Sequence, residues 1–173
     1  MTYIISINGH TPLISDTAFT APTASIIGDA ELCEQSSAFY GVSVRADTAA
    51  IRIGVGSNLQ DNVVVHADPD FPALIGANVS IGHGAVVHGC TIEDDCLIGM
   101  NATVLNGALI GSGSLVAAGA VVLEGTVIPP GSLVAGIPAK VRRPLTDTEI
   151  EGVRQNAERY RALAAAHRHA LIS

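Results

Sequence analysis

Aliphatic residues return at every sixth position along the second half of the chain. From Ile92 onward, each step of six meets another isoleucine or valine, with small or polar residues in between. A repeat of this kind is typical of solenoid proteins, in which each unit is one short strand followed by a corner. Stacking such units buries the aliphatic side chains in continuous ladders. The repeated positions are Ile92, Ile98, Val104, Ile110, Val116, Val122, Ile128 and Val134.

The same rhythm occurs upstream in three shorter runs, and it slips by one residue between Val87 and Ile92. The alternative is an ordinary β-sandwich, which would alternate with a period of two instead. We therefore expect a mainly β protein, a parallel β-helix in which three hexads form a triangular coil of about 18 residues. The expected inward positions of the three runs are Ile27, Cys33 and Phe39; Ile53, Leu59 and Val65; and Ile75, Ile81 and Val87.

After the stretch GIPAKVRRP the pattern becomes helical. Thr146, with Glu149 three residues later, forms a capping-box pattern. Apolar residues then recur at helical spacing, which predicts an α-helix packed along the side of the β-helix. We expect residues 1–145 to form the β-helix and residues 146–173 to form the helix of the same single domain. The predicted apolar stripe consists of Ile150, Val153, Ala157, Tyr160, Leu163, Ala164 and His167.

The composition agrees with a core of small aliphatic side chains, because hydrophobic residues make up 48% of the chain and aromatic residues only 3%. The net charge of -7 argues against nucleic acid or an anionic membrane as a partner. The N-terminus shows no secretory pattern, and no apolar run is long enough to span a bilayer. The three cysteines lack the spacing of a disulfide framework. We therefore expect a cytoplasmic protein with reduced thiols.

Three of the six histidines lie between residues 66 and 88. His66 and His88 are 22 residues apart, but Val65 to Ile75 spans ten residues instead of six, which indicates a loop with four inserted residues. Subtracting these four leaves 18 residues, which is one coil. The two imidazoles should therefore stack on one face at the strand spacing of about 4.8 Å. At that distance they could share one tetrahedral metal ion.

His83 has a different register, two residues after Ile81 and on the preceding face. Within one chain it should point around the corner, away from the other two histidines. A homotrimer would resolve this, with His83 of one subunit facing His66 and His88 of its neighbour. Three imidazoles with an open fourth position are typical of a catalytic zinc site. The remaining histidines, which we interpret as surface residues, are His10, His167 and His169.

Four motifs together resemble the γ-class carbonic anhydrase family. They are SVRAD (43–47), IGVGSNLQDNVVVH (53–66), IGHGAVVHGC (81–90) and IGMNATVLNGA (98–108). The similarity includes short members labelled as phenylacetate-degradation, carnitine-operon and ferripyochelin-binding proteins, and it covers nearly the whole chain. The resemblance implies a left-handed β-helix and a homotrimer. It also implies zinc, with iron or cobalt as alternatives, bound by His66, His83 and His88.

Further roles follow from the same resemblance. Gln60 matches a glutamine that orients the metal-bound water, and Asn58, two residues earlier, points the same way by strand alternation and is assigned a supporting role. Tyr160 matches a helix tyrosine that reaches towards the metal pocket, with simple packing as the alternative. No site for an organic cofactor is implied. Three residues match positions that pair with one another near the subunit interface in the family: Arg45, Asp47 and Asp61.

The implied reaction is the reversible hydration of CO2 to bicarbonate by metal-activated hydroxide. Well-studied γ-class enzymes carry an acidic loop with glutamates for proton export, whereas this chain has no glutamate between Glu34 and Glu93. The loop carboxylates near His66 are Asp68 and Asp70. We therefore expect hydration activity to be weak or absent even with the metal site intact.

Three other functions stay open at this stage. The repeats and the stretch GSLVAGIPAKVRRP also resemble CoA-dependent acyltransferases, which use a histidine as general base. Hydrolysis of CoA thioesters is a second alternative, and a non-catalytic trimeric scaffold is a third. The convergence of three histidines and the shortness of the only insertion favour a metal-dependent anhydrase.

Overall fold

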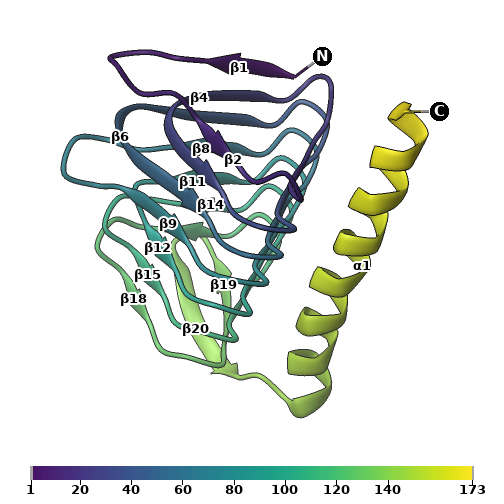
Figure 1. Ribbon diagram of the computed structural model, residues 1–173. Coiled ribbons are helices and arrows are strands. Elements are labelled where there is room, and N and C mark those ends of the chain that lie inside the picture. Colours follow the sequence, from purple (N-terminus) through teal and green to yellow (C-terminus); the bar gives the residue numbers. More distant parts are fainter. Residues whose placement is uncertain (1, 173) are drawn as a thin grey trace.

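The chain winds into a parallel β-solenoid of about seven turns, with one helix along its side (Figure 1). This computed structural model describes residues 2–172, and side chains up to residue 171. The predicted mainly β fold with stacked coils and a C-terminal helix is confirmed. The left-handed sense of the coil stays a prediction from the resemblance.

Three strand ladders run along the stack, and each coil adds one short stretch of strand to every ladder. The long strands β4 (Ser25–Leu32) and β6 (Ser43–Ile53) continue around the corner between the first two ladders and join them into one sheet. The first ladder also contains β1 (Tyr3–Ile5), β8 (Val64–His66), β11 (Val86–His88), β14 (Thr103–Val104) and β17 (Val121–Val122). The second also contains β2 (Leu13–Ile14), β9 (Ala73–Ile75), β12 (Thr91–Ile92), β15 (Leu109–Ile110) and β18 (Val127–Ile128).

The third ladder is a separate sheet. Its last two strands pair antiparallel, so the chain turns back on itself at the end of the stack. Its strands are β3 (Phe19–Thr20), β5 (Ser37–Ala38), β7 (Asn58–Leu59), β10 (Ser80–Ile81), β13 (Leu97–Ile98), β16 (Leu115–Val116), β19 (Ser132–Gly136) and β20 (Ala139–Pro144).

The inward aliphatic ladders fill the solenoid as the hexad pattern predicts. All eight repeated positions from Ile92 to Val134 are at most 3% exposed. Parallel pairing places Ile92 beside Ile110, and Ile110 beside Ile128. Each side chain therefore packs on a similar one in the next coil, which is why the sequence needs an aliphatic residue at every sixth position.

The predicted inward register of the first upstream run is wrong by one residue. Ile26, Leu32 and Ala38 point inward, where they pair with Val44, Ile53 and Leu59 and are at most 1% exposed. Both registers carry apolar residues here, so the sequence pattern is ambiguous. Outward apolar residues are tolerated here because part of the outer surface is covered. Phe39, predicted to face inward, instead packs in a cluster with Phe19 and Ala164.

The helix α1 (Asp147–Ile172) begins with the predicted capping box, because Glu149 N donates to Thr146 Oγ1 and Thr146 N donates to Glu149 Oε2. It runs beside the third ladder, contacting β3, β5, β7 and β10 (Figure 1). Leu163, predicted to lie in the buried stripe, is 39% exposed. Among the described residues, no helix combines the length and apolarity needed to cross a lipid bilayer.

His167 belongs to α1 and is half-buried on the side that faces the solenoid, as its place in the apolar stripe predicts and contrary to its interpretation as a surface histidine. Its Nδ1 lies 3.0 Å from the Tyr40 hydroxyl, and its ring packs against Phe19 and Phe39. The error arises because the aromatic cluster is assembled from residues more than 120 positions apart along the chain. This histidine therefore helps to attach the helix to the solenoid.

Candidate metal centre

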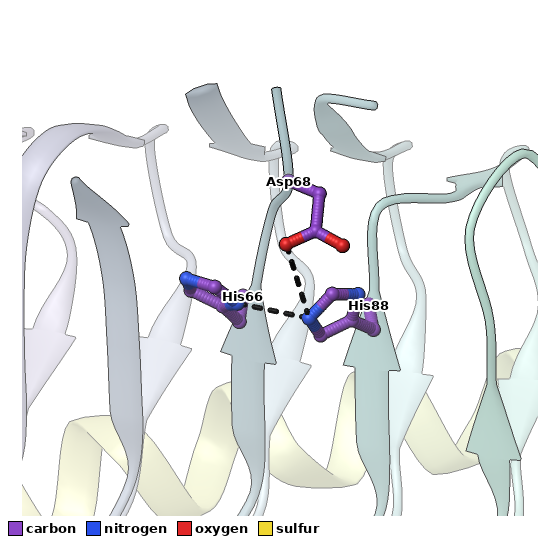
Figure 2. A group of neighbouring side chains, drawn as sticks. All are labelled: His66, Asp68 and His88. Carbon is purple, nitrogen blue, oxygen red and sulfur yellow. Dashed lines mark hydrogen bonds and ion pairs between the residues drawn. The ribbon is translucent and has the colours of Figure 1, made fainter. Parts of the chain in front are cut away.

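His66 and His88 are direct neighbours on the first ladder, paired in register across β8 and β11. Their ring centroids are 4.9 Å apart, and His66 Nδ1 lies 2.9 Å from His88 Nε2 (Figure 2). The four-residue insertion between Val65 and Ile75 forms a loop closed by a bridge between Asp68 and Phe71. The stacking predicted from the spacing of the two histidines is therefore confirmed.

The outer side of His66 faces an ion pair. His66 Nε2 lies 3.2 Å from Asp47 Oδ1, and the Arg45 guanidinium lies 2.7 Å from Asp47 Oδ2. The hydrogen bond from Arg45 is the main cause that holds the pKa of the Asp47 carboxyl below its usual range. An ionised carboxylate only accepts hydrogen bonds, so His66 Nε2 carries a proton and donates it to Asp47. In this single chain the Arg45 side chain is about half exposed, at 48%.

The outer side of His88 faces an amide. His88 Nδ1 lies 2.7 Å from Asn106 Oδ1, and Asn106 Nδ2 donates to Asp68 Oδ2 at 2.9 Å. Asp68 leans over the ring from the inserted loop, with its Oδ1 4.0 Å from His88 Nε2 (Figure 2). Asn106 was not among the predicted site residues. The coil register could have located it, because Val87 pairs with Val104 and Asn106 follows two residues later, at the corner beside His88.

His83 lies elsewhere, two residues after β10 on the third ladder and next to Tyr160 of α1. Its Nδ1 is 2.9 Å from Asp61 Oδ2, and its Nε2 is 3.2 Å from the Tyr160 hydroxyl. Asp61, which we expected to pair with a residue near the subunit interface, here contacts this histidine and accepts a hydrogen bond from Tyr40 N. Burial raises the pKa of Tyr160, so its hydroxyl stays protonated at neutral pH and can donate to His83.

Gln60 and Asn58 form a buried polar pair on the same ladder as His83. They are 6% and 1% exposed. Asn58 Nδ2 donates to Ser80 Oγ at 2.9 Å, and Gln60 Nε2 donates to Asn58 Oδ1 at 3.3 Å. These bonds fix the Gln60 amide, because its nitrogen must point to Asn58 and its carbonyl oxygen must point the other way.

A pocket of about 400 Å³ opens beside His83 and Gln60, between α1 and the third ladder. Tyr160 and Asn156 line its helix side, and aliphatic residues such as Leu97 and Val116 line the rest. Within the described part of the chain, Asn156 Oδ1 is a buried oxygen without a hydrogen-bond partner. The pocket thus offers a largely apolar wall and one free acceptor beside the polar pair.

The group His66, Asp68 and His88 has the chemistry of a metal site, since its ligand atoms lie within 4.8 Å of one another. Both imidazoles face an oxygen acceptor on their outer side, which leaves their inner nitrogens facing each other. Outer acceptors of this kind orient metal-binding histidines. Two nitrogens bound to one tetrahedral zinc are about 3.3 Å apart, given bond lengths of about 2.0–2.1 Å. The observed 2.9 Å needs only a small side-chain adjustment, so the residues fit such an ion.

The family model described as "Bacterial transferase hexapeptide (six repeats)" matches residues 72–106 and 89–124. Among solved structures, a Bacillus cereus protein described provisionally as an acetyltransferase is 33% identical, with a TM-score of 0.96 and 98% coverage of both chains. By repeat and by architecture, the protein is therefore a hexapeptide-repeat β-solenoid.

Curated relatives define the family more closely. "Probable carbonic anhydrase" of Methanocaldococcus jannaschii is 53% identical over 148 residues, covering 86% of this chain and 93% of that protein. "Gamma carbonic anhydrase 2, mitochondrial" of Arabidopsis thaliana is 43% identical over 170 residues. The alignment covers 95% of this chain but 61% of the plant protein, so the chain spans about three fifths of that relative's length. The chain belongs to the γ carbonic anhydrase family.

Proposed function

We propose that the protein is a metal-dependent carbonic anhydrase that acts as a homotrimer. In this proposal His66 and His88 of one subunit and His83 of its neighbour bind one zinc ion, with iron or cobalt as the alternative metals. The observation that carries the proposal is the pair of imidazoles held 2.9 Å apart in register, each oriented by an outer oxygen acceptor. Family membership supports it independently.

When bound by the three imidazoles, zinc would supply a nucleophile at neutral pH, because it lowers the pKa of a coordinated water to about 7. Gln60 would orient the attacking water, because its nitrogen is committed to Asn58 and its carbonyl oxygen remains free to accept a hydrogen bond. Asn58 supports that orientation. Tyr160 would lie beside His83 at the site, because its hydroxyl is 3.2 Å from His83 Nε2. CO2 would lie against the apolar wall of the adjacent pocket.

Proton export would limit the rate. Asp68 is the loop carboxylate nearest to the histidine pair, and it is engaged with Asn106. We expect a CO2 hydration rate that is low in weak buffer and rises with added imidazole, because imidazole can accept the proton in place of a side chain. A rate that is high in weak buffer and unaffected by imidazole would contradict this account.

Metal content, mass and activity together test the proposal. We expect about one zinc or iron per chain, a solution mass of three chains, and measurable CO2 hydration. A monomer in solution, or a trimer without metal, would overturn the proposed site.

We further propose that Arg45, Asp47 and Asp61 lie near the subunit interface. Residues 1–145 and 146–173 form one domain in this proposal, and the protein is cytoplasmic.

Acyl transfer is the second candidate, supported by the similar Bacillus cereus structure described as an acetyltransferase and by the pocket beside His83. In that case His83 would act as a general base, and activity would persist after metal removal. Hydrolysis of a CoA thioester would instead require the metal. Assays with acetyl-CoA and CoA thioesters, before and after chelation, separate these activities from CO2 hydration. Full metal with no activity of any kind would favour a trimeric scaffold.

A further inference from the structure

Asn106 connects the inserted loop to the histidine pair. Its Oδ1 lies 2.7 Å from His88 Nδ1, and its Nδ2 donates to Asp68 Oδ2 at 2.9 Å. The two contacts join residues 18 and 38 positions apart along the chain. Because His88 is half-buried, its hydrogen bonds to these neighbours decide which ring nitrogen carries the proton.

The chemistry of the three groups fixes the direction of both bonds. A carboxylate only accepts, so Asp68 must receive a proton from the Asn106 nitrogen. The Asn106 oxygen then points at His88, and because that oxygen only accepts, His88 Nδ1 must carry the proton. In a neutral imidazole the proton on Nδ1 leaves Nε2 with its lone pair. Nε2 is the atom that faces His66.

We propose that Asp68 and Asn106 are positioning residues that lock His88 in the Nδ1–H tautomer, so that Nε2 is ready to bind the metal. The inference rests on the proposed function, which it deepens by assigning a role to the inserted loop. Asn106 acts on His88 directly. Asp68 acts through Asn106, because its charge prevents the amide from turning over.

The backbone leaves room for this arrangement. A Cβ added to Gly89 would clash with Asn106 Oδ1 and would lie 2.8 Å from Phe71 Cβ, so any larger residue would displace the amide. Phe71 also lies over the corner at Gly107. The loop is therefore packed against the corner that presents Asn106, which holds Asp68 within reach of the amide nitrogen.

Two substitutions of Asn106 separate its acceptor role from simple packing. Asn106→Leu removes the acceptor, and we expect zinc affinity, measured by chelator competition, to fall about 10- to 100-fold. Asn106→Asp keeps an oxygen acceptor for His88 Nδ1 but loses the N–H that Asp68 accepts, so we expect its zinc affinity to lie between those of wild type and Asn106→Leu. Asn78→Gly is the control, because Asn78 also bonds an aspartate, Asp95, at another corner and has a left-handed backbone (φ 55°) that glycine accepts, and it should leave zinc affinity unchanged. Equal affinity in wild type and Asn106→Leu would overturn the proposal.

A double-mutant cycle tests the indirect role of Asp68. We expect Asp68→Ala to weaken zinc binding in the wild-type background but not in the Asn106→Asp background, because a carboxylate has no amide orientation to lose. An equal loss in both backgrounds would show instead that Asp68 binds the metal itself, and it would overturn the indirect role.

The tautomer can be observed without any metal. We expect two-bond ¹H–¹⁵N correlation spectra of the metal-free protein to show the proton of His88 on Nδ1, and the Asn106→Leu variant to show a mixture. A wild-type spectrum with the proton on Nε2 would overturn the proposal. This result does not depend on activity, so a protein that shows the Nδ1–H tautomer but does not hydrate CO2 would refute the proposed function alone.

Discussion

At the scale of single residues, we expect removal of the His88 imidazole to leave the ladder that carries it intact. Val87, which precedes it, is fully buried and provides the packing of this strand, whereas the imidazole is only half-buried on the outside. We expect His88→Ala to bind less than about a tenth of the wild-type zinc, since one ligand and its oriented nitrogen are lost. Its circular dichroism spectrum should match wild type. His10→Ala, at an exposed histidine, should keep its metal, and a metal-replete His88→Ala protein would exclude His88 as a ligand.

The residues that could be predicted are those whose position follows from counting along the chain. His66 and His88 were placed on one face because a coil has a fixed length once the insertion is subtracted. Counting also places Asn106 at the corner beside His88, but it does not predict the role of this residue, which depends on where the amide points after the loop has packed. His167 was misjudged for a related reason, because its aromatic partners come from the opposite end of the chain.

At the scale of elements, the start of α1 should make stability sensitive to acid. The Arg143 guanidinium and the Thr146 backbone N–H lower the pKa of Glu149 to about 2 from an ordinary value of 4.5. The ionised form therefore stabilises the fold above pH 4.5, and this contribution is lost as the pH falls towards 2. We expect Glu149→Gln to lower the Tm at pH 7 and to converge with wild type near pH 2. Glu158→Gln, at an exposed position on the same helix, is the control for removing one negative charge.

The inward ladders should carry much of the stability of the strands. Ile110 is fully buried, whereas Val127, on the neighbouring strand β18, is 66% exposed. We expect Ile110→Ala to cost about 2–5 kcal/mol in urea unfolding, because it opens a cavity between coils. Val127→Ala should change the free energy of unfolding by less than about 0.5 kcal/mol. Similar losses at the two positions would mean that the ladder does not dominate stability.

The pattern of elements was predictable wherever only one register was apolar. From Ile92 onward a single hexad frame carries aliphatic residues, and every repeated position is buried. Near the N-terminus, Ile26 and Ile27 are both aliphatic, so the frame could not be chosen from the sequence. In the structure, the pairing of β4 with the continuous strand β6 selects the frame in which Ile26 points inward.

At the scale of the whole molecule, the three strand ladders separate His83 from His66 and His88 within one chain. The coil period predicted that His66 and His88 share a ladder, and that His83 belongs to another. In the described residues, the metal-ligand group contains His66, Asp68 and His88 but not His83. How subunits meet depends on the shape and side chains of their outer surfaces. A repeat pattern that records mainly inward positions could not predict this.

A solenoid should also open unevenly, because each coil contacts only its neighbours and the terminal coils have a neighbour on one side only. The three cysteines can serve as probes of this opening. Cys33 lies in an early coil and is 8% exposed. Cys90 and Cys96 lie in middle coils and are at most 1% exposed. Burial raises the pKa of Cys90 and of Cys96 to about 12, so thiolate forms at neutral pH only after the surrounding coils separate. We expect a thiol reagent to label Cys33 first as urea is added, and to label the other two only within the main unfolding transition. Peptide mapping after timed labelling measures the order. Simultaneous labelling of all three would mean that the coils separate as one cooperative unit instead.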